Sequence, residues 1–175
     1  MYECFCTRAD LHSASAPHQQ DSHIYAGTCR NLSACERESL RKQGRAAAFR
    51  ITVPQAWYGT SDCFQGDFKL QLAQDCGDFI IRRNDGVYAY QLAVVVDDAY
   101  QGVTNVTRAI DLLASTPQQI FLQEALGLST PSYGHLPLLV AQDARRLAKR
   151  DKDASIDLML ERYKTPERLL GHIAY

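Results

Sequence analysis

The 175-residue sequence lacks any apolar run of the roughly 18 residues that a membrane-spanning helix requires. Its opening residues, Met1-Tyr2-Glu3-Cys4, contain none of the basic, apolar and small-residue regions that make up a secretory signal peptide. Internal repeats and low-complexity segments are absent as well. We therefore expect a cytoplasmic, globular protein with no membrane partner.

The sequence also has no excess of either charge. Its 19 lysines and arginines face 20 aspartates and glutamates, so the net charge is −1. A protein that binds nucleic acid through its overall charge is clearly basic, so any RNA contact here has to come from local clusters. Apolar residues make up 46% of the chain and charged residues 22%, which is ordinary for a globular protein of one domain or slightly more.

Cysteine is too sparse for a disulfide-stabilised scaffold, because such frameworks occur in short, cysteine-dense, secreted domains. Cys4 and Cys6, followed after a polar, histidine-rich connection by Cys29, instead have the form of a zinc knuckle. Two thiolates on a tight turn can share a tetrahedral ion with a distant pair. The alternative is that these thiols are only small buried hydrophobes. The chemistry of the residues leaves the fourth ligand open among three side chains: His18, His23 and Cys35.

The central part of the chain predicts a hairpin that ends at a site. Val87–Val96 is a β-branched and aromatic run, apolar at nearly every position, which predicts a strand covered on both faces. A short loop, Asn84-Asp85-Gly86, joins it to a preceding strand at Phe79–Arg83. Asp97-Asp98 follows the run, at the strand end where open α/β sheets hold their ligands. Arg108 is expected further on, near the start of a helix.

Capping residues predict the helices on either side of this hairpin. Ser33 and Glu36 form a capping box that begins a charged surface helix, and Thr116-Pro117 begins another. A strand after the second helix completes a strand–helix–strand crossover with parallel strands. The remaining strands and helices are expected at Ala47–Val53, over an antiparallel unit at Trp57–Lys69, at His135–Val140, at Ile156–Tyr163 and from Thr165-Pro166.

Residues 88–119, YAYQLAVVVDDAYQGVTNVTRAIDLLASTPQQ, resemble the glutamyl-tRNA synthetase family of class I synthetases, most closely the glutamyl-Q tRNA(Asp) synthetases. The resemblance extends over nearly the whole chain, and several separate motifs occur in the family's order. It implies a ligase that activates glutamate with ATP and Mg²⁺ and then transfers it to queuosine-modified tRNA(Asp).

The resemblance also implies roles for individual residues. The family's Cys-x-Cys pair followed by Tyr-x-x-x-Cys holds zinc, and it maps onto Cys4, Cys6, Tyr25 and Cys29. The family's glutamate-binding pair corresponds to Tyr90 and Arg108, whose phenol hydrogen-bonds the substrate and whose guanidinium holds a carboxylate with a planar fork.

A basic segment at Ala144–Asp151 resembles the family's mobile loop, which stabilises pyrophosphate during activation. By this resemblance Lys149 is the catalytic, ATP-binding lysine, and Arg146 is a supporting catalytic charge. Ala148 stands where the family has Ser, and Ala144 where Gly is usual, so we expect a weakened or altered loop.

The fold implied by the resemblance is α/β: the second half of a Rossmann-like class I catalytic domain with a zinc-binding, partly antiparallel β insertion. We expect this insertion at residues 1–75, the Rossmann half at 76–150 and the incomplete start of a helical segment at 151–175. The family's first Rossmann half has no counterpart here, so we expect an inactive isolated chain, with the missing half as a partner. The alternatives are a glutamyl-tRNA synthetase fragment and a non-catalytic, zinc-bearing binding module.

Overall fold

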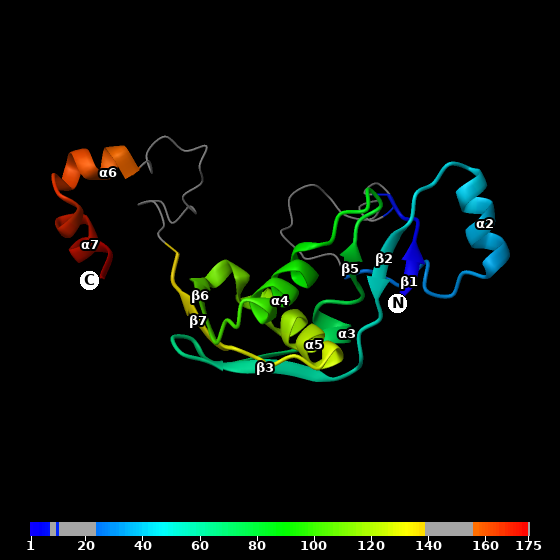
Figure 1. The fold of residues 1–175 in the computed structure, drawn as a ribbon, viewed down its shortest axis with the longest axis horizontal. Coiled ribbons are helices and arrows are strands. Elements are labelled where there is room, and N and C mark those ends of the chain that lie inside the picture. Colours follow the sequence, from blue (N-terminus) through cyan, green and yellow to red (C-terminus); the bar gives the residue numbers. More distant parts are fainter. Residues whose placement is uncertain (8–9, 11–23, 139–155, 175) are drawn as a thin grey trace. The chain divides into compact units, whose positions relative to one another are not determined.

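The computed structural model describes residues 1–7, 10, 24–138 and 156–174. The chain forms two compact units, one ending at Leu136 and the other starting at Pro137. Within the described part of the larger unit, the strands build three small sheets and two longer helices pack beside them (Figure 1). This mixture of helices and strands confirms the predicted α/β content.

A three-stranded antiparallel sheet holds the amino-terminal segment. Strand β1 (Tyr2–Cys4) pairs with β2 (Ala48–Ile51), and β2 pairs on its other side with β5 (Phe79–Arg82). The predicted strands at residues 47–53 and 79–83 are thereby confirmed. The sheet places Cys4 opposite Ala48, so the first predicted zinc ligand lies against a strand that is distant in sequence.

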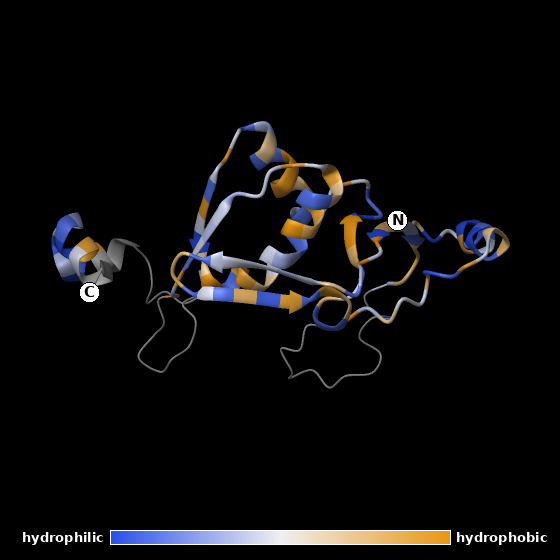
Figure 2. Cartoon of the chain, turned by 90° about the horizontal axis from the view of Figure 1, so that it is seen from below, coloured by the Kyte–Doolittle hydropathy of each residue, from blue (hydrophilic) through white to orange (hydrophobic). Residues whose placement is uncertain are grey.

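Two further predicted elements are present in this unit. Helix α2 (Ala34–Lys42) begins at Ser33, whose side chain forms the expected capping box with Glu36. None of its residues is buried, and Figure 2 shows it as mainly hydrophilic, as a surface helix should be. Strands β3 (Trp57–Asp62) and β4 (Gly66–Gln71) form the predicted antiparallel unit.

The predicted strand at Val87–Val96 is wrong, because the chain forms helix α4 (Tyr90–Tyr100) there. Periodicity could not decide between the two, since a run that is apolar at nearly every position suits a buried helix as well as a buried strand. Val95 is the buried residue of α4, while Val96 on the next position is exposed. Asp97-Asp98 consequently lies near the end of a helix and does not follow a strand.

The hairpin expected before this run is reduced to a turn. Gly86 has a positive φ of 87°, and Arg83 N–H donates to the Val87 carbonyl at 2.8 Å. Within the described residues, pairing beyond the turn consists of an isolated antiparallel bridge between Arg82 and Tyr88.

A parallel crossover follows, but its strands differ from those predicted. Strand β6 (Asn105–Ala109) and strand β7 (Ser132–Leu136) pair in parallel, and helix α5 (Thr116–Leu126) connects them. Arg108 therefore lies on a strand and not at the start of a helix. Strand β7 also begins earlier than the predicted His135–Val140, because its register with β6 extends back to Ser132.

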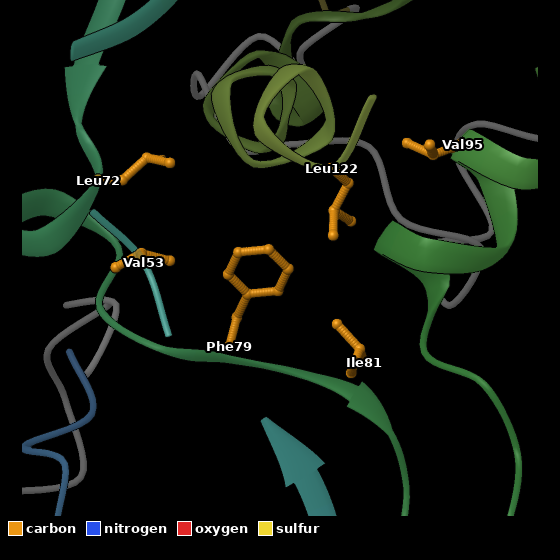
Figure 3. Packing of buried hydrophobic residues seen from close by; sticks show 6 residues of the cluster. All are labelled: Val53, Leu72, Phe79, Ile81, Val95 and Leu122. Atoms are coloured by element: carbon orange, nitrogen blue, oxygen red, sulfur yellow. The ribbon is translucent and has the colours of Figure 1, made fainter. Parts of the chain in front are cut away.

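Short helical segments complete the larger unit: α3 (Leu72–Asp75) and the 3₁₀ helix η1 (Ile110–Ser115). The core packs the apolar faces of α4 and α5 against β5 and α3, and Figure 3 shows the side chains of these elements pointing toward one another. The buried residues of this cluster are Val53, Leu72, Phe79, Ile81, Val95 and Leu122.

The smaller unit contains helices α6 (Ile156–Tyr163) and α7 (Pro166–Ala174), which confirm the two predicted helices. In the portion of the chain that the structure describes, no helix is both long and apolar enough to cross a membrane. The predicted basic segment at 144–151, with Lys149 and Arg146, lies outside the described residues.

Candidate functional site

Three cysteines from two separate segments of the sequence converge next to β1. Cys4 ends this strand, Cys6 follows it, and Cys29 comes from the turn before α2. The Cys6 and Cys29 sulfurs are 3.5 Å apart, and all three sulfurs lie within 4.8 Å of one another. Each of the three is a free thiol, and Cys4 and Cys29 are buried. We call these three cysteines together with Tyr25 the cysteine knuckle.

The Tyr25 hydroxyl occupies the fourth corner of this cluster. It lies 3.4 Å from the Cys4 sulfur and 3.7 Å from the Cys6 sulfur, and it accepts a hydrogen bond from Cys29 N–H at 2.8 Å. A tetrahedral zinc ion separates two sulfur ligands by about 3.8 Å and a sulfur from an oxygen ligand by about 3.6 Å. The donor set therefore has the spacing of a zinc site with Tyr25 in the fourth position.

Burial opposes the ionisation of Cys6 and Tyr25. It raises the pKa of the Cys6 thiol to about 12, and it also raises the pKa of the Tyr25 phenol. Burial acts the same way on Cys4, but its hydrogen bond with Tyr25 and the nearby Arg50 guanidinium together bring the pKa of this thiol below its usual range.

Arg50 is the cation that accompanies the cysteine knuckle. Its guanidinium is buried, lies 3.8 Å from the centre of the Tyr25 ring and donates to the Asp78 carbonyl at 2.7 Å. Its Nε has no hydrogen-bond partner among the described residues. Three thiolates around a dication leave one negative charge, and Arg50 is placed to compensate for it. The charges present thus fit a metal-bound state of this site.

Asp78 is a buried carboxylate that links the segment after Cys29 to the three-stranded sheet. Asp78 is 1% exposed, and its Oδ2 accepts hydrogen bonds from the Tyr2 hydroxyl at 2.6 Å and from Arg30 Nε at 2.8 Å. Its Oδ1 accepts from Val53 N–H at 3.0 Å. Burial opposes the charge of Asp78, but these hydrogen bonds and Arg30 hold its pKa below the usual range.

A second polar network surrounds Arg108 on β6. Its Nε donates to His135 Nε2 at 2.9 Å, and its Nη2 donates to Thr116 Oγ1 at 2.8 Å. His135 lies opposite Arg108 in the parallel register of β6 and β7 and is fully buried. Its Nδ1 contacts the Oδ2 of Asp62, the last residue of β3, at 2.5 Å. Strands β3, β6 and β7 thus contribute one side chain each to a continuous chain of hydrogen bonds.

Arg108, one of the two predicted glutamate-binding residues, lies against Tyr133 of β7, and the other, Tyr90, influences the ionisation of the same phenol. The Arg108 guanidinium carbon is 5.4 Å from the Tyr133 ring centre, while Tyr90 begins α4 and is 52% exposed. The pKa of Tyr133 is raised, chiefly by burial; Asp98 and Tyr90 add to this effect, and Arg108 opposes it. Tyr90, Asp98 and Arg108 therefore all lie within electrostatic range of one buried phenol.

Sequence reasoning did not single out Asp62, Thr116 as an arginine partner, or His135. A signal was present for the last of these, since His135 stands in a short apolar strand where an imidazole needs buried partners. Asp62 offered less, because an aspartate before a turn usually serves only that turn.

The mixed α/β fold, with its parallel crossover from β6 through α5 to β7, agrees with the class that the family comparison identifies, the catalytic domain of class I aminoacyl-tRNA synthetases. A profile of the catalytic domain of class I tRNA synthetases (E and Q) matches residues 1–173. The chain belongs to this family, which confirms the resemblance seen in the sequence.

Individual relatives are similar over most of the chain. A glutamyl-Q tRNA(Asp) synthetase of Neisseria meningitidis serogroup C is 47% identical over 158 residues, which cover 90% of this chain and 52% of the relative. One of Symbiobacterium thermophilum is 44% identical and matches 100% of this chain and 55% of its own length. A glutamate tRNA ligase structure from Elizabethkingia meningosepticum superposes with a TM-score of 0.69 at 25% identity, covering 87% of this chain and 32% of that one. The chain thus spans about half the length of the curated relatives it matches.

Proposed function

We propose that this chain forms part of a glutamyl-Q tRNA(Asp) synthetase-type ligase, which activates glutamate with ATP and Mg²⁺ and transfers it to tRNA(Asp). The observation that carries this proposal is the 47% identity, over 90% of the chain, to a relative of that name. Activation by a class I synthetase is an in-line attack on the α-phosphate of ATP. It depends on positioning and charge stabilisation and needs no covalent help from the protein.

Tyr90 and Arg108 are the residues proposed to bind glutamate. The contact of Arg108 with the Tyr133 ring, and the electrostatic influence of Tyr90 on the same phenol, support this assignment. A guanidinium can hold a carboxylate in a bidentate pair, and a half-exposed phenol can hydrogen-bond the same ligand. Lys149 and Arg146 are proposed to contact ATP.

The cysteine knuckle is proposed to hold a structural zinc ion. Its spacing and the neighbouring Arg50 support this role, and four protein ligands leave no open position for catalysis on the metal. Zinc would link β1 to the turn before α2, and so stabilise the proposed region at 1–75. The regions at 76–150 and 151–175 are proposed to supply the active-site half and the start of a helical segment.

A second candidate function is that of a glutamyl-tRNA synthetase, which would use tRNA(Glu). It is favoured by two solved structures that superpose on this chain, both glutamate tRNA ligases from Elizabethkingia species with TM-scores of 0.69. The two candidates share activation of glutamate and differ in the tRNA that receives it. A non-catalytic zinc-bearing module is the remaining alternative, and it would show neither reaction.

Glutamate-dependent ATP–pyrophosphate exchange tests the proposal. The assay is run on the 175-residue protein alone and together with the part of the Neisseria meningitidis relative that this chain does not cover. We expect exchange in the combined sample and transfer of glutamate to tRNA(Asp). Transfer only to tRNA(Glu) would favour the second candidate, and a folded, zinc-loaded sample without exchange would contradict both.

Arg108→Lys separates the guanidinium fork from its charge in the same assay. We expect the KM for glutamate to rise by about tenfold or more, because hydrogen bonds to a charged group are lost. Arg83→Lys is the matched control, since Arg83 is an exposed arginine paired with Asp85 in a turn. An unchanged KM in Arg108→Lys would remove Arg108 from the glutamate site.

A further inference from the structure

The carboxylate of Asp62 is oriented by the backbone around it. Its Oδ1 accepts hydrogen bonds from three N–H groups: Phe64 at 3.1 Å, Gln65 at 3.1 Å and His135 at 3.0 Å. The residue is 4% exposed, so water does not compete for these positions. Because Oδ1 is committed to three donors, Oδ2 is the atom that faces His135 Nδ1.

Three groups contact the imidazole: Asp62 at Nδ1, and both Arg108 and the Thr116 hydroxyl at Nε2, the hydroxyl at 3.3 Å. The hydroxyl can donate as well as accept, so Asp62 and Arg108 decide the tautomer. Burial opposes ionisation of Asp62, yet its hydrogen bonds with the His135 side chain and with the surrounding N–H groups hold its pKa well below the usual range. An ionised carboxylate only accepts hydrogen bonds, so Nδ1 has to donate. Arg108 Nε only donates, so Nε2 has to accept. The neutral Nδ1–H form meets both conditions, whereas an Nε2–H would oppose the guanidinium N–H.

Among the described residues, the hydrogen bonds of the Arg108 side chain are all made by one edge of its guanidinium. Nε is bound to His135, and Nη2 is bound to Thr116 Oγ1 and weakly to the Leu112 carbonyl at 3.4 Å. Across residues 24–138 and the other described segments, no hydrogen-bond partner is found for Nη1. The guanidinium is therefore fixed along one side, with donors remaining on the other.

We propose that Asp62 and His135 are positioning residues: the carboxylate holds the imidazole in its Nδ1–H form, and Nε2 then orients Arg108 so that its free donors face a substrate carboxylate. The last clause rests on the proposed role of Arg108 in glutamate binding. The competing explanation is that the Asp62–His135 pair only fastens β3 to β7. Both explanations predict a loss of stability when the pair is removed, so stability cannot separate them.

A pair of substitutions at His135 separates the two explanations. In His135→Gln the amide oxygen can reach the position of Nε2 and accept from Arg108, while the contact with Asp62 is lost. In His135→Asn the amide nitrogen can replace Nδ1 and donate to Asp62, while the acceptor for Arg108 is lost. Asn is shorter than Gln by one methylene and leaves the larger void, so the two variants are compared by which hydrogen bond each keeps and not by their stability.

Asp62→Asn provides the third variant. The three backbone N–H groups require an acceptor, so the amide oxygen takes the place of Oδ1 and the amide NH₂ faces His135 Nδ1. Nδ1 then has to accept, which moves the imidazole proton to Nε2, opposite Arg108 Nε–H. This substitution inverts the tautomer without removing a side chain.

The first measurement is ¹⁵N NMR of the 175-residue protein, which reads the tautomer of His135 and the solvent protection of Arg108 Nε–H without any substrate. We expect Nδ1–H and a protected Nε–H in the wild type. Protection should persist in His135→Gln and be lost in His135→Asn and Asp62→Asn. An Nε2–H tautomer in the wild type, or equal protection in the two His135 variants, would overturn the proposal.

The second measurement is the KM for glutamate in the combined exchange assay. Misplacement of a binding group by about 1 Å can cost up to about 100-fold in activity. We expect His135→Asn to raise the KM toward this limit. His135→Gln should keep the KM much closer to the wild-type value. If Arg108→Lys leaves the KM unchanged, the glutamate role of Arg108 fails, while the NMR result still decides whether Asp62 and His135 orient the guanidinium.

Discussion

The described part of the molecule contains two buried aspartates with similar surroundings, Asp78 near the cysteine knuckle and Asp62 near Arg108. Their hydrogen-bond networks lead to different groups. Their exposed fractions are 1% and 4%, and both have a lowered pKa because hydrogen bonds outweigh burial. Each also joins segments that are far apart in sequence, with separations of 76 residues between Tyr2 and Asp78 and 73 between Asp62 and His135.

The difference lies in what stands beyond the first hydrogen-bond partner. Asp78 contacts Tyr2 of the sheet, Val53 of the core and the partly exposed Arg30, so the network closes within the fold. The network of Asp62 continues through His135 to Arg108, a guanidinium with donors left over. The role of a buried carboxylate therefore depends on which group its hydrogen-bond network reaches, and its burial and pKa do not reveal that group.

The largest effect is expected on the Asp78 side, from removal of zinc. Zinc at about 1,000 times its Kd stabilises the folded state by about 4 kcal/mol, which corresponds to about 8–16 °C in Tm for a chain of this size. Cys29→Ser should lose the metal and this stabilisation, as measured by metal analysis and thermal unfolding. Cys35→Ser is the control, because Cys35 is exposed and outside the cysteine knuckle. Full zinc content in Cys29→Ser, or its loss in Cys35→Ser, would contradict the ligand assignment.

A smaller loss is expected from Asp78→Asn. The amide replaces one acceptor oxygen by a donor, which then faces either Val53 N–H or the Tyr2 and Arg30 donors. We expect the free energy of unfolding to fall by about 2–4 kcal/mol in urea titrations. The Arg108 Nε–H signal should keep its protection, because this network closes before it reaches β6. If Arg108 Nε–H lost as much protection in Asp78→Asn as in Asp62→Asn, the two aspartates would not differ in their connection to Arg108.

Local signals predicted the parts of the fold that depend on neighbouring residues. The capping box of Ser33 and Glu36 and the β3–β4 hairpin both follow from a few adjacent positions. The family resemblance additionally identified Tyr25 as a neighbour of the three thiols, which the chemistry of the residues alone had left open.

The sequence predictions were wrong or incomplete where the structure depends on packing between distant segments. The run at 87–96 became α4 because Val95 is buried against residues of β5 and α5, and no local periodicity records such a contact. The contacts through His135 were equally hidden, since His135 is 27 positions from Arg108 and 73 from Asp62. The proposed roles of Lys149 and Arg146 remain predictions.

The smallest effect is expected from the pH dependence of the Asp62 contact. The pKa of Asp62 is lowered in the folded state, so its contribution to stability is present above the unfolded pKa of about 3.9 and is lost as the pH falls toward the folded pKa. Asp62→Asn cannot titrate, so the stability difference between wild type and this variant should shrink by about 1–2 kcal/mol or less between pH 6 and the most acidic pH at which both still fold.

Asp97→Asn on the exposed end of α4 is the matched control for this measurement, because it removes one carboxylate without breaking a buried contact. Loss of zinc in acid affects both variants alike and cancels in the comparison. Urea titrations at several pH values should show a pH-dependent difference for Asp62→Asn and a nearly constant one for Asp97→Asn. Parallel curves for the two variants would mean that the Asp62–His135 contact is not made by an ionised carboxylate, and the argument for a fixed His135 tautomer would lose its basis.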